Sequence, residues 1–315
     1  MKETKSRIVV IGSYAVGMTM SCARFPKSGE TVKGSGFRAL HGGKGSNQAI
    51  AVARLGGNAV FGSCVGNDAF GDAAVEMLRA EGIDARFVKR SDKVPTGVGF
   101  VVVDATGNNE IVIDLGANEF LFAQDMDAMK DTIANSDILL LQLETNLEAV
   151  VRAIELAHAQ GVMTILNPAP FQALPDGVIR KTSIITPNET EAMEMLGLDR
   201  HTPVSGAELA RRLHGHFGVT AVVTLGPDGA YIKSAETDEA VPTYEIAVRD
   251  TTGAGDTFSA ALAVALGEGK DLRTSVAFAN KAASHSVSLE GVVESIPTRH
   301  TVDSSDLKIK GRDRR

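Results

Sequence analysis

Short apolar runs alternate with longer amphipathic segments along most of the chain. The apolar runs predict buried strands at residues 7–12, 60–65, 138–143, 162–166, 183–185 and 221–225. Segments of helical period that begin or end at capping residues predict helices at residues 46–55, 69–81, 147–160, 189–196, 207–216 and 258–266. This alternation predicts an α/β fold in which helices cover both faces of a central, mostly parallel sheet.

Two regions interrupt this pattern. Residues 18–40 form short alternating runs broken by glycine and proline, and residues 98–104 and 110–113 flank a turn at Thr106–Asn109. We expect them to form a small antiparallel sheet outside the main one, a lid drawn from about residues 14–41 and 96–115. The chain as a whole is expected to form a single domain over residues 1–315, with a solvated, disordered tail at residues 303–315.

Composition excludes several classes of partner. The formal net charge is −7, which disfavours binding to a nucleic-acid backbone. No apolar run reaches the roughly 18 residues that a membrane span needs, and the polar N-terminus is unlike a signal peptide. Cys22 and Cys64 have neither a disulfide pattern nor metal-ligand spacing, so a reducing, cytoplasmic setting is expected.

Polar residues follow several predicted strands. Glu144, Asn167, the run Thr186–Glu191 and the run Gly226–Gly229 each stand just after a strand. One such residue is usually a helix cap or part of a solvated loop. Four strand ends in succession would lie at one edge of a parallel sheet, which is where ligands bind in such folds.

The run Asp250–Thr257 contains the clearest candidate chemistry. Gly253 and Gly255 allow a tight turn, and the apolar helix that follows would direct unpaired amides at an anion such as phosphate. Asp256 lies inside this cradle, where a carboxylate is useful as a base that takes a proton from a hydroxyl attacking a phosphoryl group. The alternative is that the glycines form only a turn and Asp256 only an N-cap.

A second glycine-rich run, His41–Gln48, offers Lys44 and Asn47 as hydrogen-bond donors for hydroxyls or anions. Its spacing differs from that of a P-loop, since the lysine stands two residues before the serine. Taken alone, the run is equally consistent with a loop followed by a helix.

Together, residues 42–49 and 250–258 resemble the two signature motifs of the ribokinase family, within the phosphofructokinase-B superfamily of carbohydrate kinases. Asn188–Glu191 is similar to the Asn-x-x-Glu motif of that family, and the match runs from about residue 7 to residue 297. The resemblance implies a ribokinase-like fold. It also implies an ATP-dependent kinase that phosphorylates a primary hydroxyl of a pentose or related sugar.

The resemblance further implies a role for each matching position. Asp256 would be the base, with an anion hole made by Gly253, Ala254 and Gly255. The sugar would be held by Gly42, Gly43, Lys44, Asn47, Glu144 and Asp256. Mg²⁺ and phosphate would be ordered, largely through water, by Asn188 and Glu191. The nucleotide site would comprise Asn188, Thr224, Gly226, Gly229, Gly255 and Asn280. A monovalent cation, expected to be an activating K⁺, would be bound by Asp250, Thr252, Ser286, Leu289, Gly291 and Ser295. Dimerisation through the lid is also implied.

One departure concerns the substrate. Where the family carries Asn and Asp shortly after the first strand, this chain has Ala15 and Gly17. Two groups that would bind sugar hydroxyls are therefore missing. A different pentose, a deoxy or branched sugar, a sugar acid or a nucleoside remains open, with Tyr14 as a candidate stacking face. The alternatives to a sugar kinase are a nucleoside kinase of the same superfamily and a catalytically silent sugar-binding regulator.

Overall fold

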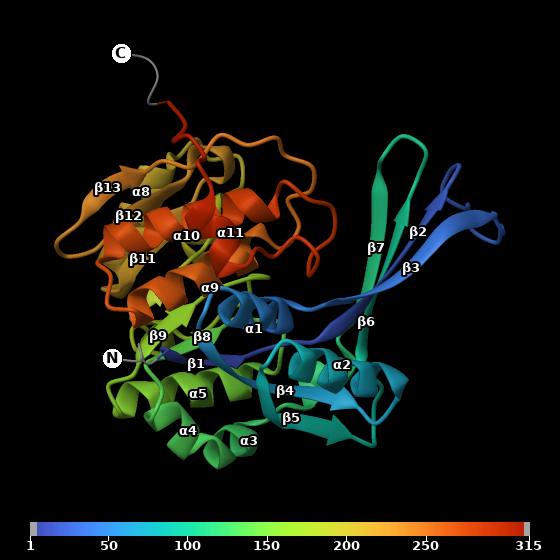
Figure 1. Cartoon of the computed structure of the whole chain (residues 1–315), viewed down its shortest axis with the longest axis horizontal. Coiled ribbons are helices and arrows are strands. Elements are labelled where there is room, and N and C mark those ends of the chain that lie inside the picture. Colours follow the sequence, from blue (N-terminus) through green and yellow to red (C-terminus); the bar gives the residue numbers. More distant parts are fainter. Residues whose placement is uncertain (1–4, 312–315) are drawn as a thin grey trace.

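Within residues 5–311, which the computed structural model describes, a nine-stranded sheet runs through the body of the molecule (Figure 1). Its strand order is β13-β12-β11-β10-β9-β8-β1-β4-β5. Seven neighbouring strands are parallel: β11 (Thr220–Thr224), β10 (Ile184–Ile185), β9 (Met163–Leu166), β8 (Ile138–Leu141), β1 (Arg7–Ile11), β4 (Asn58–Gly66) and β5 (Asp84–Ser91). The hairpin of β12 (Ala230–Lys233) and β13 (Asp238–Val241) adds antiparallel strands at one edge.

Helices cover both faces, because successive side chains of a strand point to opposite sides. In β1, Ile8 and Val10 belong to one apolar core, and Val9 and Ile11 belong to the other. The first core includes residues of α1 (Lys44–Arg54), α2 (Ala69–Ala80), α9 (Ala254–Gly267), α10 (Leu272–Ser286) and α11 (Arg299–Ser304). The second includes residues of α3 (Ala123–Ala128), α4 (Lys130–Ala134), α5 (Leu147–Ala159), α6 (Asp176–Ile179), α7 (Glu189–Met195) and α8 (Gly206–Phe217). The predicted mostly parallel α/β architecture is confirmed.

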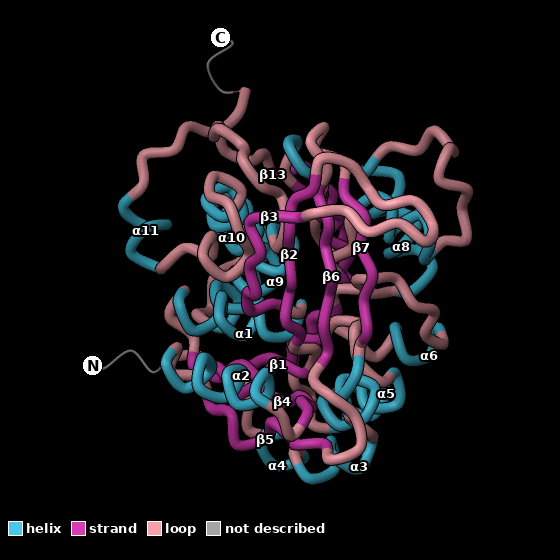
Figure 2. The backbone as a smooth tube through the Cα atoms, turned by 90° about the vertical axis from the view of Figure 1, so that its right-hand side faces the viewer, coloured by secondary structure: helices cyan, strands magenta, loops and turns pink. Residues whose placement is uncertain are grey.

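A second sheet projects from the body beside α2 (Figures 1 and 2). It consists, in order, of β3 (Gly34–Gly42), β2 (Ala15–Cys22), β6 (Gly97–Val103) and β7 (Asn109–Asp114). The β2–β3 and β6–β7 pairs are antiparallel, as the sequence predicts, but β2 and β6 run parallel. The second sheet is therefore mixed, because two hairpins from distant parts of the chain join side by side.

The C-terminal segment differs from the predicted tail. Asp303 and Ser304 end α11. Further on, the carbonyl of Lys308 accepts a hydrogen bond from Glu245 N at 2.8 Å, and Lys310 N donates to the Thr243 carbonyl at 2.9 Å. Backbone pairing thus holds this polar segment against the body, which side-chain composition does not reveal. The last part of the predicted tail, residues 312–315, lies outside the described residues.

Two expectations concern the whole chain. In the described part, no helix is both long and apolar enough to cross a membrane. Both cysteines, Cys22 and Cys64, are free and buried.

Candidate active site

The N-terminus of α9 forms one wall of the candidate site. Gly253 is its N-cap and has a φ of 78°, a left-handed conformation that favours glycine. Every residue from Asp256 to Ala265 is buried, so the helix is fixed within the core. The amides of a first helical turn have no helical carbonyl to bond, and they carry the positive end of the helix dipole. This terminus is therefore suited to bind an anion.

Asp256 lies in the first turn of α9 but does not cap it. Its side chain is 5% exposed, and its Oδ2 accepts a hydrogen bond from Asn47 Nδ2 at 2.9 Å. Its Oδ1 accepts one from Gln48 Nε2 at 3.1 Å. The interpretation of Asp256 as a simple N-cap is wrong, because Gly253 occupies that position and both bonds come from α1.

A buried amide chain holds Gln48 in place. Gln142 Nε2 donates to Gln48 Oε1 at 2.5 Å, and Gln48 Nε2 also donates to Asn167 Oδ1 at 3.1 Å. Because the Gln48 carbonyl is engaged by Gln142, its NH₂ group must face Asp256 and Asn167. Sequence reasoning missed Gln48 and Gln142. The only available signal was the position of Gln48 directly after Asn47 in the glycine-rich run, and of Gln142 at the end of a predicted strand.

Glu144 is anchored beside this chain. Its Oε2 accepts hydrogen bonds from Ser13 Oγ at 2.7 Å and from the backbone amide of Lys44 at 3.0 Å. Its Oε1 lies 4.0 Å from Lys44 Nζ. The carboxylate therefore joins the end of β8 to the start of α1, and Oε1 remains available to a ligand hydroxyl.

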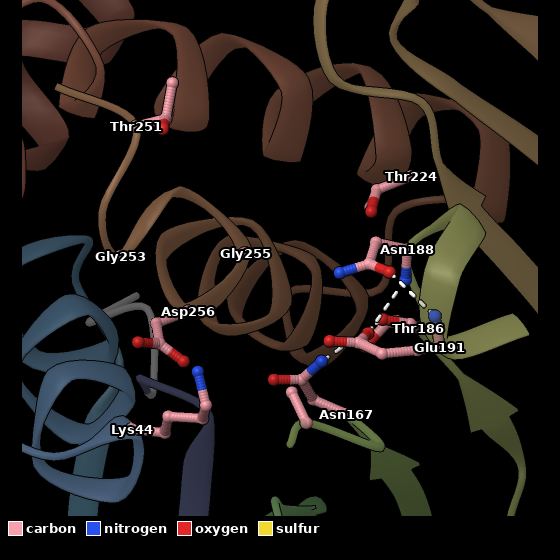
Figure 3. A pocket seen from close by; sticks show the side chains of 11 residues that line it. Lys44, Asn167, Thr186, Asn188, Glu191, Thr224, Thr251, Gly253, Gly255 and Asp256 are labelled. Carbon is pink, nitrogen blue, oxygen red and sulfur yellow. Dashed lines mark hydrogen bonds between the residues drawn. The ribbon is translucent and has the colours of Figure 1, made fainter. Parts of the chain in front are cut away.

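A cavity of about 190 Å³ opens at the carboxyl edge of the parallel strands. In Figure 3, Lys44 and Asp256 lie on one side, and Asn188 and Glu191 lie on the other. It is lined by Lys44, Asn167, Ala169, Thr186, Asn188, Glu191, Thr224, Thr251, Gly253, Gly255 and Asp256. The polar ends of β9, β10 and β11 thus meet the N-terminus of α9, because these strands are consecutive neighbours in the sheet.

Asn188 and Glu191 form a reciprocal capping box at the start of α7. Asn188 Oδ1 accepts from Glu191 N, and Glu191 Oε2 accepts from Asn188 N, both at 2.9 Å. Burial raises the pKa of Glu191 above its usual value. The capping box fixes both side chains and leaves Glu191 Oε1 free to bind a cation or water.

Burial and neighbouring charges shift the pKa values of the charged side chains in the cavity in opposite directions. Burial raises the pKa of Asp256, and the Lys44 ammonium and the amide donors act in the opposite direction. Burial would lower the pKa of Lys44, but nearby carboxylates, Asp256 first among them, raise it above its usual value. Lys44 therefore stays charged, and Asp256 holds a proton more readily than a solvent-exposed aspartate, as suits a base.

The predicted nucleotide residues lie around the end of β11. Thr224 lines the cavity, and Gly226 and Gly229 form the next turn, with φ values of 52° and 90°. Asn280 is buried, and its Nδ2 donates to the carbonyls of Val241 at 3.0 Å and Pro242 at 3.2 Å. Its amide group is therefore engaged by the backbone at the end of β13 and just after it.

The predicted monovalent-cation residues lie in two segments joined by Asp250. Its Oδ1 accepts hydrogen bonds from Thr252 N and Oγ1 at 2.9 and 2.7 Å, and its Oδ2 accepts one from Gly291 N at 3.2 Å. The hydroxyls of Ser286 and Ser295 donate to nearby backbone carbonyls, and Leu289 is exposed. Backbone carbonyls are thus the groups left for a cation.

Replacing Gln48 by leucine should move the acidic limb of the kcat–pH profile to higher pH. The hydrogen bond from Gln48 lowers the pKa of Asp256, so its loss raises that pKa further. Under the predicted role of Asp256 as the base, the variant would hold this carboxyl protonated, and lose activity, at pH values where the wild type still works. A kcat–pH titration measures the shift, with the exposed Gln160→Leu exchange as the control that leaves the profile in place. An unmoved limb in Gln48→Leu would contradict this role.

The chain is similar in sequence and in fold to known carbohydrate kinases. The chain matches the model of the pfkB family carbohydrate kinases over residues 5–299. It is 37% identical to a ribokinase of Haemophilus influenzae over 94% of this chain and 96% of that protein. It is 33% identical to a deoxyribokinase of Salmonella typhi over 92% and 95% of the two chains. The structure of Arabidopsis thaliana ribokinase with ribose and ATP is similar with a TM-score of 0.85, at 31% identity and over 95% and 98% of the two chains.

Proposed function

Because this chain belongs to the pfkB family of carbohydrate kinases, we propose that Asp256 is the base through which it transfers the γ-phosphate of ATP to a primary hydroxyl of a pentose or related sugar. The observation that carries this proposal is the Asp256 carboxylate, which lines the cavity in the first turn of α9. A carboxylate beside an anion-binding helix terminus is suited to act on a hydroxyl that attacks phosphate.

In the proposed reaction, the acceptor hydroxyl donates its proton to Asp256 as its oxygen bonds to the γ-phosphorus. The bond from that phosphorus to the β–γ bridging oxygen breaks, and ADP leaves with the electron pair. Amides of Gly253, Ala254 and Gly255 would stabilise the charge on the transferring group. Lys44, which faces the same cavity, adds a positive charge at that point.

The acceptor would be held on the side of α1 and β8. Asn47 Oδ1 is buried without a hydrogen-bond partner, and such an atom is satisfied when a ligand hydroxyl donates to it. Glu144 Oε1 offers a second acceptor. Gly42 and Gly43 connect this wall to the second sheet. Gly43 has a φ of 96°, and a Cβ there would lie 2.7 Å from the Tyr14 Cα. Residue 43 therefore has to be glycine, and we propose that Gly42 and Gly43 form the hinge by which the second sheet closes as a lid over the sugar.

The residues present fit the two cations that the family implies. Mg²⁺ is usually bound by one or two carboxylates together with substrate phosphates and water. Glu191 Oε1 and Asn188 offer such a set across the cavity from Asp256. When bound, the ion would neutralise phosphate charge. A K⁺ ion would be held by the loops that Asp250 joins, at Thr252, Ser286, Leu289, Gly291 and Ser295.

The function is tested by measuring ADP release with ATP, Mg²⁺ and a panel of sugars and nucleosides, each with and without K⁺. We expect release that depends on the acceptor and yields a phosphate ester at a primary hydroxyl, visible by phosphorus NMR. The alternative, a catalytically silent binding protein, predicts that some acceptors bind without ADP release. Retention of Asp256 and Lys44 at the cavity favours the enzyme.

We also propose a homodimer formed through the second sheet, in a reducing, cytoplasmic setting. Met20, Phe100 and Val112 lie on three neighbouring strands of this sheet, and their side chains are exposed, that of Val112 to 70%. Such an apolar sheet surface commonly finds a partner. Sedimentation velocity should give twice the chain mass, and a monomer at micromolar concentration would contradict the proposal.

A further inference from the structure

We propose that one row of residues, on the face of the second sheet that looks onto the acceptor site, forms an apolar subsite. The preferred acceptor then presents to it an edge without free hydroxyls, either deoxygenated or carrying an apolar or planar substituent. This inference rests on the proposed kinase function and specifies its substrate class.

The two faces of β2 can be told apart by what they contact. Tyr14, Val16 and Met18 belong to an apolar cluster with residues of α2 and β4, so their face is turned toward α2. Alternation puts Ala15 and Gly17 on the opposite face. Just before them, Ser13 donates to Glu144, so this second face begins at the acceptor-binding wall.

The far end of the same face is turned toward the segment that follows α10. Leu40 is the partner of Gly17 in β3, and Arg38, two residues away, therefore lies on the face of Gly17. The Arg38 guanidinium lies 3.5 Å from Glu290, a residue of the segment that follows α10. The face of Gly17 thus spans from Glu144 to Glu290, on the side where the reaction is proposed to occur.

This face carries a row of four residues that we call the glycine row: Leu40, Gly17, Gly99 and Ile113. Gly17 is the register partner of both Leu40 and Gly99, and Gly99 is the partner of Ile113, so the row crosses all four strands. Ile113 is 62% exposed. A Cβ built on Gly17 would come no closer than 3.8 Å to a neighbouring atom, and one on Gly99 no closer than 3.6 Å. The row is therefore open and flat between two apolar side chains.

The glycine row has no side-chain hydrogen-bonding group. The side chains proposed to bind the acceptor's hydroxyls, namely Asn47, Glu144 and Asp256, belong to the body of the protein. A hydroxyl directed at the row loses water on closure and gains no side-chain partner, which disfavours binding. A methylene group or the face of a ring gains apolar contact there instead.

The test compares kcat/KM for ribose, 2-deoxyribose and a purine nucleoside. We expect the wild type to prefer 2-deoxyribose or the nucleoside to ribose by about tenfold or more, the usual scale for one unmatched hydroxyl. The 2-deoxyribose and nucleoside arms distinguish a deoxygenated edge from a planar substituent. Gly17→Asp puts a carboxylate into the glycine row and should raise the ribose-to-deoxyribose or ribose-to-nucleoside ratio of kcat/KM about tenfold.

Thr19→Asp is the matched control, because it adds the same charge to the same face two residues further along β2. It should leave the ratios unchanged. Thermal melting reports whether each variant folds, and Gly17→Ser, with a smaller polar side chain, should shift the ratios in the same direction if Gly17→Asp does not fold.

The inference is overturned if ribose is used as well as the other two acceptors, or if both Gly17 variants leave the ratios unchanged while turnover still depends on Asp256. In that case the kinase function stands. If no acceptor yields ADP above the level of Asp256→Asn, the proposed function fails and the inference fails with it.

Discussion

Replacing Asp256 by asparagine is expected to lower kcat by about 10²–10⁴-fold, the range typical for loss of a general base. Asparagine has nearly the same shape but does not accept the proton of the acceptor hydroxyl. The affinity for ATP, measured by calorimetry, should stay within about threefold of wild type, because no step of nucleotide binding needs that proton acceptor.

A matched aspartate-to-asparagine exchange at Asp303, whose side chain is exposed on α11, should leave kcat unchanged. Steady-state kinetics with a saturating acceptor, together with thermal melting, separates loss of chemistry from loss of folding. If Asp256→Asn keeps more than about a tenth of the wild-type kcat, Asp256 does not act as the general base.

The second large effect is expected for Gly253→Ala, for which we predict a fall in kcat of about 10²–10³-fold, the scale measured when a donor to a transition-state oxyanion is lost. Gly253 has a φ of 78°, and an added Cβ would lie 2.7 Å from Val292 Cγ1. Alanine therefore forces the turn to shift, and the first N–H groups of α9 no longer point toward the transferring phosphate.

Gly269→Ala supplies the control, just beyond the other end of α9. Gly269 has a φ of 80°, and its added Cβ would meet no heavy atom within 4 Å. Both variants carry the strain of alanine in a left-handed conformation, about 1–2 kcal/mol, but only the first disturbs the site. Equal kcat values for the two variants would contradict an anion hole at residues 253–255.

Much of the fold can be predicted from local sequence patterns. The strands at the two edges of the main sheet lack these patterns. The central parallel strands are mostly apolar, so they are recognisable. By contrast, β5 (Asp84–Ser91) mixes charged and apolar residues because it lies at an edge. The hairpin β12–β13 at the other edge was missed as well, since its strands are short and partly exposed.

Part of the candidate site could likewise be predicted from the sequence, and part could not. Parallel strand ends meet at one edge, so the convergence of Asn167, Asn188 and Thr224 on one cavity could be expected from their positions along the chain. The bond between Gln48 and Gln142 joins residues 94 positions apart, and its partners are set by tertiary packing. No local pattern distinguishes a glutamine held in such a chain from one that faces solvent.

The unbroken burial of α9 from Asp256 to Ala265 contrasts with β7, in which all six residues are exposed. Amide hydrogens in the middle of α9 should exchange with deuterium only when the whole protein unfolds, whereas those near the tip of the second sheet open locally. Substitutions in β7 therefore perturb few packed neighbours, while most substitutions in α9 would disrupt the core. Given the proposed role of the second sheet in acceptor binding, selection can accordingly change the acceptor by altering this sheet and leave the phosphate-transfer chemistry intact.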